Sequence, residues 1–189
     1  MRKIIGIDEV GRGAWAGPLL FCAVILSSSI DGLADSKTLS KNQREFLTKK
    51  IKENTEFIGL GWVTPQEVDD MGLTKASTLA CERAIRHAPK NTKILIDGSV
   101  NFLPLNKIAE CVIGGDAKVP EISAASIVAK VERDLYMSKV DKLYEHYNFR
   151  NNVGYGTKDH KEAIEKHGLT PIHRWSYKPI KAFLDSYEA

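Results

Sequence analysis

The sequence predicts a single α/β domain, and three observations support this prediction. Short apolar runs typical of buried strands recur along the chain, at residues 4–7, 19–26 and 93–96. Segments with helix start signals and helical apolar spacing lie between and after them. The chain has 189 residues, 43% of them hydrophobic and 27% charged, which is enough for one domain with a full core.

The first strand ends in two adjacent carboxylates, Asp8 and Glu9. A loop with three close glycines follows, at Gly11, Gly13 and Gly17. Neighbouring acids repel each other and resist burial unless a positive charge accompanies them, and a divalent metal ion with oxygen ligands is the obvious candidate. A solvated turn that carries both acids by chance is the alternative.

The three glycines also form a GxGxxxG pattern after a strand, as dinucleotide-binding turns do. In such turns a helix follows, and its N-terminus holds the pyrophosphate. Here the run at residues 19–26 continues as a strand, and the two acids would repel a phosphate group. We therefore do not expect a nicotinamide-dependent oxidoreductase.

A capping box predicts the first helix. Ser40 is followed three residues later by Gln43, and the helix should run to about residue 54 with Leu47 and Ile51 on its inner face.

A third strand and two helix segments come next. Residues 57–63 read as a strand whose Gly59 and Gly61 indicate a close backbone approach or a sheet edge. Residues 64–67 carry a cap, a proline and an acid that start a helix, and residues 73–87 form a longer helix.

Two further acids follow strands in the middle of the chain. Asp97 comes directly after the strand at residues 93–96, and Asp116 follows the strand at residues 109–113. Ligands of open α/β sheets bind at the carboxyl ends of the strands. A sheet that brings the first, fourth and fifth strands together would therefore gather these two acids beside the first pair.

Such a cluster predicts metal-dependent chemistry. Four carboxylates, without a Cys or His pair, favour Mg²⁺ or Mn²⁺ over zinc. Two such ions bridged by a carboxylate activate water and stabilise the leaving oxygen in phosphodiester hydrolysis. No Ser-His-Asp spacing and no phosphate-binding loop of the P-loop type competes with this interpretation.

The last part of the chain is helical. The longest helix should span residues 121–147, and its inner face repeats at helical spacing (Ala124, Val128, Val131 and Leu135). Asp134 is a competing acid near that face, and Lys130 four residues earlier favours a local ion pair as its explanation. Helices at residues 158–167 and from about 179 follow, and the last docks through four residues (Ile180, Phe183, Leu184 and Tyr187).

Charge and cysteine content add expectations about partners and location. Residues 37–53 carry six basic side chains against two acidic ones, and residues 158–181 carry six against three, which suits binding of a polyanion. The three cysteines have no metal-binding spacing and each lies in an apolar context, so we expect buried free thiols in the cytoplasm. No apolar run is long enough for a membrane helix, and the chain enters a strand directly, so we expect no signal peptide.

Several motifs together resemble one enzyme family, type 2 ribonuclease H (ribonuclease HII). They follow the family's order over nearly the whole chain, at residues 8–13, 35–37, 96–98, 115–116, 124–130 and 154–155. The resemblance implies an RNase H-like fold, with a five-stranded mixed central sheet flanked by helices. It implies a catalytic domain at residues 1–150 and a small C-terminal helical part at residues 151–189. It also implies that Asp8, Glu9, Asp97 and Asp116 are catalytic and bind the metal ions.

The resemblance also implies how the substrate is read. Main-chain groups at Gly11, Arg12 and Gly13 would sense the ribose 2′-hydroxyl, Tyr155 would stack on the deoxyribose that follows, and Lys37 would bind a backbone phosphate. The implied substrates are RNA–DNA hybrids and single ribonucleotides in duplex DNA, as in ribonucleotide excision repair. Cleavage 5′ of the ribonucleotide would leave 3′-hydroxyl and 5′-phosphate ends.

Arginine in the Gly11–Gly13 motif argues against the sister type 3 enzymes. No clamp-binding peptide is recognisable near the end of the chain, a monomer is expected, and no protein partner is required. A non-catalytic module that only binds hybrids is the alternative function, and the presence of all four acids argues against it.

Overall fold

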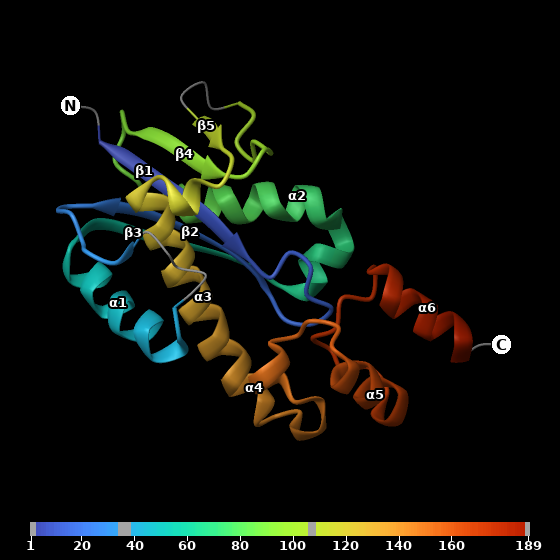
Figure 1. Ribbon diagram of the computed structural model, residues 1–189. Coiled ribbons are helices and arrows are strands. Elements are labelled where there is room, and N and C mark those ends of the chain that lie inside the picture. The colour runs from blue at the N-terminus through green and yellow to red at the C-terminus, as the bar shows by residue number, and fades with distance from the viewer. Residues whose placement is uncertain (1–2, 34–38, 106–108, 188–189) are drawn as a thin grey trace.

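The computed structural model describes residues 3–33, 39–105 and 109–187 (Figure 1). Five strands form one sheet, namely β1 (Ile4–Val10), β2 (Leu19–Leu26), β3 (Thr55–Val63), β4 (Lys93–Asp97) and β5 (Ala109–Val112). Their order across the sheet is β3-β2-β1-β4-β5. The β1, β2 and β3 strands pair antiparallel, whereas β4 and β5 run parallel to β1. The predicted five-stranded mixed sheet is therefore confirmed.

The register of the parallel strands brings their carboxyl ends level. Ile7 of β1 pairs with Ile96 of β4, so the next residues are level: Asp8, two residues before the end of β1, and Asp97, the last residue of β4. Asp97 is in turn paired with Val112 at the end of β5. The first, fourth and fifth strands are thus neighbours, as the gathering of the acids requires.

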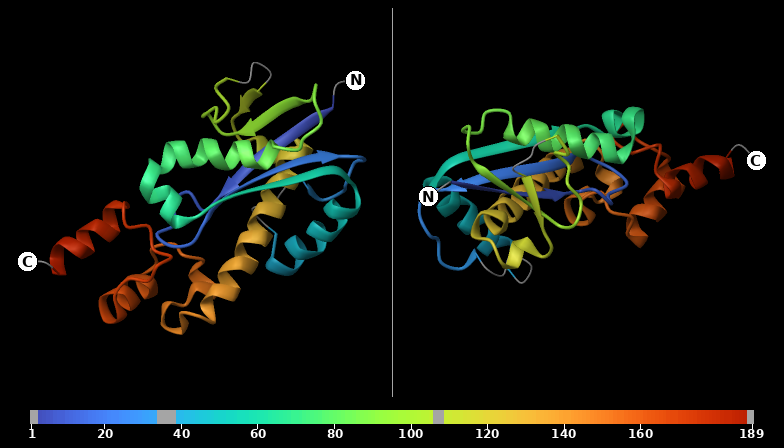
Figure 2. Two further views of the ribbon diagram at one scale, coloured as in Figure 1. Left: turned by 180° about the vertical axis from the view of Figure 1, so that it is seen from behind. Right: turned by 90° about the horizontal axis from the view of Figure 1, so that it is seen from above.

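Helices cover both faces of the sheet (Figure 2). The α2 helix (Pro65–Ile85) packs its small residues on one face, where they share a core with β1, β2 and β4. The α1 helix (Lys41–Glu53) and the α3 helix (Pro120–Asp141) cover the other face. The capping box of Ser40 and Gln43 is present, and Leu47 and Ile51 are buried as predicted.

Strand β3 is an edge strand, and α2 packs closely on its glycines. A side chain at Gly61 would place its Cβ 1.8 Å from the Ala80 carbonyl oxygen, and one at Gly59 would stand 1.8 Å from that of Ala84. Both glycines therefore serve the close approach that the sequence predicts.

The two predicted helix segments are both present within α2, separated at Gly72, whose φ of +78° is non-helical. Two other predictions were wrong in detail. Leu135 on α3 is 45% exposed, whereas Met137 and Val140 further along the helix are buried. Cys22 and Cys81 are buried free thiols, but Cys111 lies on edge strand β5 and is exposed.

The predicted helix at residues 121–147 ends early, at Asp141. A short 3-10 turn, η3 (Glu145–Tyr147), follows, and Asn148 then takes a left-handed φ of +53°. This reversal lets Tyr147 stack on Phe149 with ring centroids 5.3 Å apart in the interior, which a continuous helix would prevent.

The remaining helices form the C-terminal part of the molecule, namely α4 (Phe149–Asn152), α5 (Lys158–His167) and α6 (Lys178–Tyr187). The α4 helix lies next to the far end of α3, and α6 lies farthest from it (Figure 1). They share a third core with Met137 and Val140. Another short 3-10 turn, η2 (Gly115–Ala117), follows β5. No helix in the described ranges is both long and apolar enough to cross a membrane.

Candidate active site

The acid pair Asp8 and Glu9 stands at the carboxyl end of β1, in the middle of the sheet. Asp8 is 8% exposed and Glu9 is partly buried. The main-chain N–H of Glu9 donates a 2.7 Å hydrogen bond to Asp8 Oδ1, and Ser126 on α3 also hydrogen-bonds that carboxyl. The solvated turn that was the alternative does not fit this burial.

Burial and like charge both disfavour the ionised form of this pair. Burial raises the pKa of Asp8 to about 7, with the Glu9 and Asp97 charges adding to the effect. Burial also raises the pKa of Glu9, and Arg12 opposes that shift. The surrounding side chains thus supply too little positive charge to keep both carboxylates ionised in this buried position.

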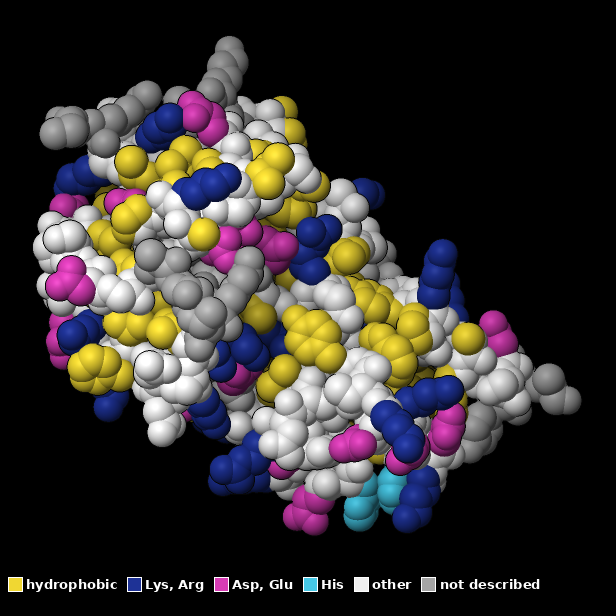
Figure 3. All heavy atoms as spheres, viewed as in Figure 1, with side chains coloured by type: hydrophobic (Ala, Val, Ile, Leu, Met, Phe, Trp, Pro, Cys, Tyr) yellow, Lys and Arg dark blue, Asp and Glu magenta, His cyan; other side chains and the backbone are white. Residues whose placement is uncertain are grey.

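Asp97 and Asp116 lie on adjoining elements at the same sheet end. Asp97 Oδ1 accepts a 2.7 Å hydrogen bond from the N–H of Gly115, the residue before Asp116 in η2. Asp116 is 5% exposed and borders a cavity of about 270 Å³ lined by residues 29–33 and 116–120. Figure 3 shows acidic side chains gathered near the middle of this face, with Lys and Arg beside them.

The acids share a region but do not form a closed coordination shell. Within residues 3–33, 39–105 and 109–187, no three His, Cys, Asp or Glu side chains lie close enough together to enclose an ion. The donor set nevertheless fits a hard divalent cation, because it consists of carboxylate oxygens whose mutual repulsion such an ion would relieve.

A buried arginine, Arg133 of α3, binds the glycine loop after β1 through hydrogen bonds to its main chain. Its guanidinium donates to three main-chain carbonyls, those of Pro18 at 2.9 Å, Ala16 at 3.1 Å and Val153 at 2.7 Å. Gly11 has φ of +87°, and a Cβ there would lie 2.3 Å from Arg133 Nε. Glycine is therefore required at this point of the turn.

A second buried arginine, Arg174, holds the loop from the C-terminal part. Its Nε and Nη2 donate to the Gly17 carbonyl at 3.1 and 2.9 Å, and its Nη1 donates to the Arg12 carbonyl at 3.1 Å. The hydroxyl of Tyr177 also donates to the Arg12 carbonyl. Because its carbonyls are bound from within, the loop keeps one conformation beside the acids.

Arg12 reaches from the loop toward the acid pair. Its Nη1 lies 3.5 Å from Glu9 Oε1, and its guanidinium lies 5.2 Å from the ring centroid of Phe102. Arg12 Nε is buried without a hydrogen-bond partner among the described residues. The side chain therefore keeps a donor for a further acceptor near Glu9.

Tyr155 lies against the same loop, although 142 residues separate it from Gly13 in the sequence. A Cβ on Gly13 would stand 3.9 Å from Tyr155 Cε1. The N–H groups of Trp15 and Ala16 donate to the Gly154 carbonyl at 2.8 and 3.1 Å, which fastens the two segments together. The Tyr155 ring is 37% exposed, so it presents one surface to solvent beside Gly13.

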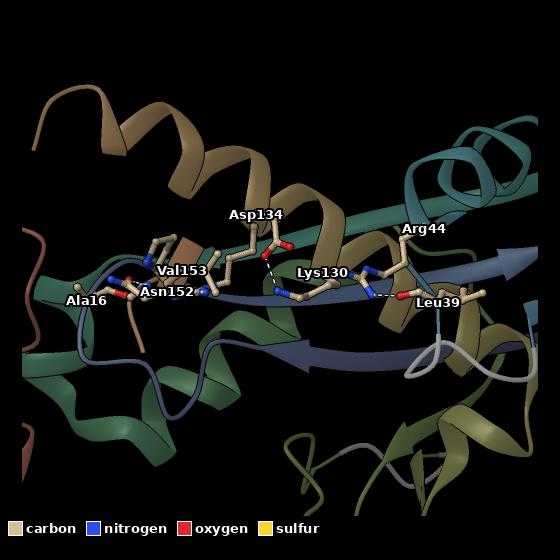
Figure 4. A network of polar contacts seen from close by, with 10 residues as sticks. Ala16, Leu39, Arg44, Lys130, Asp134, Asn152 and Val153 are labelled. Atoms are coloured by element: carbon tan, nitrogen blue, oxygen red, sulfur yellow. Dashed lines mark hydrogen bonds and ion pairs between the residues drawn. The ribbon is translucent and has the colours of Figure 1, made fainter. Parts of the chain in front are cut away.

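Two other predicted residues have different outcomes. Lys37 lies outside the described residues, as does the rest of its motif at residues 35–37. Lys130 forms an ion pair with Asp134 at 2.6 Å, as predicted (Figure 4). Figure 4 also shows Arg44 of α1, which donates to the Leu39 carbonyl, on the far side of Lys130.

Sequence reasoning missed the residues that hold the site from within. Ser126, Arg133 and Arg174 contact the acid pair or the loop. The available signal was position: Ser126 and Arg133 are seven residues apart on α3 and so lie on one helix face. Nothing in the local pattern distinguishes Arg174.

The structure also contradicts the dinucleotide alternative. After Gly17 the chain enters strand β2 and no helix, so the loop offers no helix N-terminus for a pyrophosphate.

Comparison with known proteins agrees with this geometry. The family model for ribonuclease HII matches residues 5–180. A ribonuclease HII of Pelagibacter ubique is 46% identical over 189 residues, covering 97% of this chain and 100% of that protein. The crystal structure of ribonuclease H2 from Pyrococcus horikoshii superposes with a TM-score of 0.84 at 26% identity, over 98% of this chain and 99% of that one. Bst ribonuclease HIII in complex with Mn²⁺ has the same fold, with a TM-score of 0.75 at 18% identity over 98% of this chain and 70% of that one.

Proposed function

The chain belongs to the ribonuclease HII family, and from that premise we propose a substrate, a metal requirement and a role for each site residue. As a member of the family it is a hydrolytic endonuclease that cleaves RNA in RNA–DNA hybrids. The proposal is that it also cuts on the 5′ side of a single ribonucleotide in duplex DNA. The products would carry 3′-hydroxyl and 5′-phosphate ends.

One observation carries the proposal. The Gly11–Gly13 turn follows the β1 acids directly in the chain, and Tyr155 lies against that turn, 3.9 Å from where a Cβ of Gly13 would stand. This supports a site in which the carboxylates cut and the turn and Tyr155 sense the ribose 2′-hydroxyl.

Asp8, Glu9, Asp97 and Asp116 would hold Mg²⁺ or Mn²⁺, two ions during catalysis. The bound ions would supply an activated water and stabilise the leaving oxygen. The chain would contribute the four carboxylates at the carboxyl ends of β1, β4 and β5. Ser126 and the Gly115 N–H hold two of these carboxyl groups in place, those of Asp8 and Asp97.

The substrate strand would cross the loop between the acids and Tyr155. Main-chain groups of Gly11, Arg12 and Gly13 would read the 2′-hydroxyl. The Tyr155 ring would stack on the next deoxyribose, so an RNA-to-DNA junction would be preferred. Lys37 would bind a backbone phosphate. We further propose that the protein acts as a monomer in the cytoplasm, since Cys22 and Cys81 are buried free thiols.

Cleavage-site mapping on paired duplexes tests the proposal. One duplex carries a single ribonucleotide and the other an all-RNA strand, both with Mg²⁺ or Mn²⁺. We expect one cut 5′ of the ribonucleotide, loss of cutting in Asp97→Asn and Asp116→Asn, and loss of junction preference in Tyr155→Ala. Asp70→Asn, at an exposed position of α2, is the matched control. Binding without product under either metal would show a hybrid-binding module and overturn the proposal.

A further inference from the structure

Two buried histidines stand directly behind Tyr155 and have no part in the roles assigned above. His160 on α5 is 0% exposed and His173, in the turn before Arg174, is 1% exposed. Their Nε2 atoms lie 3.0 Å apart. Two ring nitrogens at this distance form a hydrogen bond only when one of them carries the proton.

The outer partners decide which nitrogen that is. The Thr170 residue offers His173 Nδ1 its main-chain N–H at 2.9 Å, its hydroxyl at 2.9 Å and its carbonyl oxygen at 3.3 Å, and the closer N–H donor favours this nitrogen as an acceptor. At the other end His160 Nδ1 lies 2.9 Å from the Tyr155 carbonyl oxygen, which can only accept, so His160 Nδ1 carries a proton. The shared proton then belongs to His173 Nε2.

The result is a one-way relay of hydrogen bonds between neutral rings. It runs from the Thr170 N–H through His173 and His160 to the Tyr155 carbonyl. Aromatic side chains enclose the pair, with Phe149 5.3 Å from the His160 ring and Tyr147 5.5 Å from the His173 ring. Burial lowers the pKa of both histidines, which keeps both rings neutral at pH 7.

The relay ends on the residue that carries the exposed recognition ring. The Tyr155 carbonyl accepts from the Thr157 N–H at 2.8 Å as well as from His160, and the Tyr155 N–H donates to the Asn152 carbonyl at 2.9 Å. The main chain of Tyr155 is therefore fixed on both sides of its Cα. The direction in which its ring leaves the main chain follows from that.

We propose that His160 and His173 are positioning residues for Tyr155. By orienting its peptide carbonyl through the relay, they set the ring against the Gly11–Gly13 turn and so set the preference for RNA-to-DNA junctions. This inference rests on the function proposed for Tyr155 above.

Three variants test the relay through the ratio of junction cleavage to all-RNA hybrid cleavage. His160→Leu removes the bond to Tyr155, whereas His160→Asn keeps a side-chain amide where Nδ1 stood. His167→Leu, at an exposed position of the same helix, is the matched control. We expect the ratio to fall about fivefold in His160→Leu, the factor of one ordinary hydrogen bond, and to recover in His160→Asn.

A double-mutant cycle separates positioning from general destabilisation. In a Tyr155→Ala background, His160→Leu should leave the ratio unchanged, because the residue through which it acts is gone. An equal loss on both substrates, or the same fall in both backgrounds, would overturn the inference. Wild-type protein without any junction preference would instead overturn the proposed role of Tyr155.

A measurement independent of activity checks the relay itself. Nitrogen NMR of the histidine rings at pH 7 should show His160 protonated on Nδ1 and His173 on Nε2. This readout serves even where His160→Leu fails to fold. The opposite tautomers, or a charged ring in either residue, would contradict the relay.

Discussion

The guanidinium group of Arg133 lies 5.7 Å from the ring centroid of Tyr155, while its N–H groups bind main-chain carbonyls of both segments that form the recognition surface. One buried side chain thus joins the loop after β1 to the turn before α5. Among the described residues Arg133 forms no ion pair with a carboxylate, and burial lowers its pKa to about 10. Its charge is stabilised by carbonyl dipoles and the aromatic ring.

Arg133→Met should therefore both destabilise the protein and weaken junction recognition. Three carbonyls lose charge-assisted donors, and we expect a loss of about 3 kcal/mol in the free energy of unfolding. Arg133→Lys keeps the charge, but a lysine ammonium group cannot donate to all three carbonyls in this geometry. Its stability and junction cleavage should therefore lie between those of the wild type and Arg133→Met. Urea denaturation and junction cleavage measure both effects, with exposed Arg150→Met as the control. Wild-type stability in Arg133→Met would show that the loop does not need this clamp.

Asp8→Asn should stabilise the metal-free protein at pH 8. The pKa of Asp8 is raised from 3.8 to about 7, so the folded state binds more protons than the unfolded state between these values. This contribution to stability is present below pH 4 and is lost as the pH rises to 7, on the order of a few kcal/mol. The amide of Asp8→Asn carries no charge, so this variant removes the cost of burying an ionised carboxylate at pH 8.

Metal should act on the wild type in the opposite direction. An ion that binds only the folded state raises the melting temperature, by an amount that grows with the logarithm of its concentration relative to its dissociation constant. We expect Mn²⁺ to stabilise wild type and Asp70→Asn, and to have little effect on Asp8→Asn. Melting curves in chelator and in Mn²⁺ check this. Equal metal stabilisation of Asp8→Asn would remove Asp8 from the binding site.

Much of the fold followed from the sequence because local and tertiary signals agree in this chain. The strand that begins at Ile4 and the capping box at Ser40 are local patterns, and both are present, although β1 continues past the predicted end at Ile7 to Val10. The end of α3 could not be predicted, because it depends on the burial of Tyr147 against Phe149, a contact made only in the folded protein. Leu135 shares the helical spacing of the inner face but is exposed, because the buried face of α3 continues through Met137 and Val140 instead.

The candidate site shows the same division. The candidate acids could be predicted because each lies at or near the end of a strand, and the order of the strands brings Asp8 and Asp97 level. The role of Arg174 could not, because it binds the loop through the main-chain carbonyls of Arg12 and Gly17, far away in the sequence. Contacts between residues so far apart in the chain produce no recognisable sequence pattern.

Gly61→Ala tests the close packing of α2 on the sheet. The new methyl group would stand 1.8 Å from the Ala80 carbonyl oxygen, so the helix must move away from the edge strand. We expect a loss of about 3 kcal/mol, measured by thermal or urea denaturation, as for overpacked cores. Gly32→Ala, where nothing lies within 4 Å, should cost only the strain of a positive φ, about 1 kcal/mol. Equal losses in the two variants would argue against the close approach.

The buried histidine pair predicts acid sensitivity. The pKa of His173 is lowered from 6.5 to about 4, and that of His160 is lowered as well, so the unfolded state binds more protons than the folded state in this range. Stability from the pair is complete above pH 6.5 and is lost as the pH falls toward 4, by up to about 1.4 kcal/mol per pH unit for each proton. Asp8 contributes to the pH dependence of stability with the opposite sign over an overlapping range, so the two effects partly cancel in the wild type.

The measurement therefore belongs in the Asp8→Asn background, where urea denaturation between pH 4 and 7 should show stability rising with pH. Adding His173→Asn should flatten that rise, because the relay no longer contains two rings that must stay neutral. An unchanged slope would mean that the histidines are not held neutral by the fold.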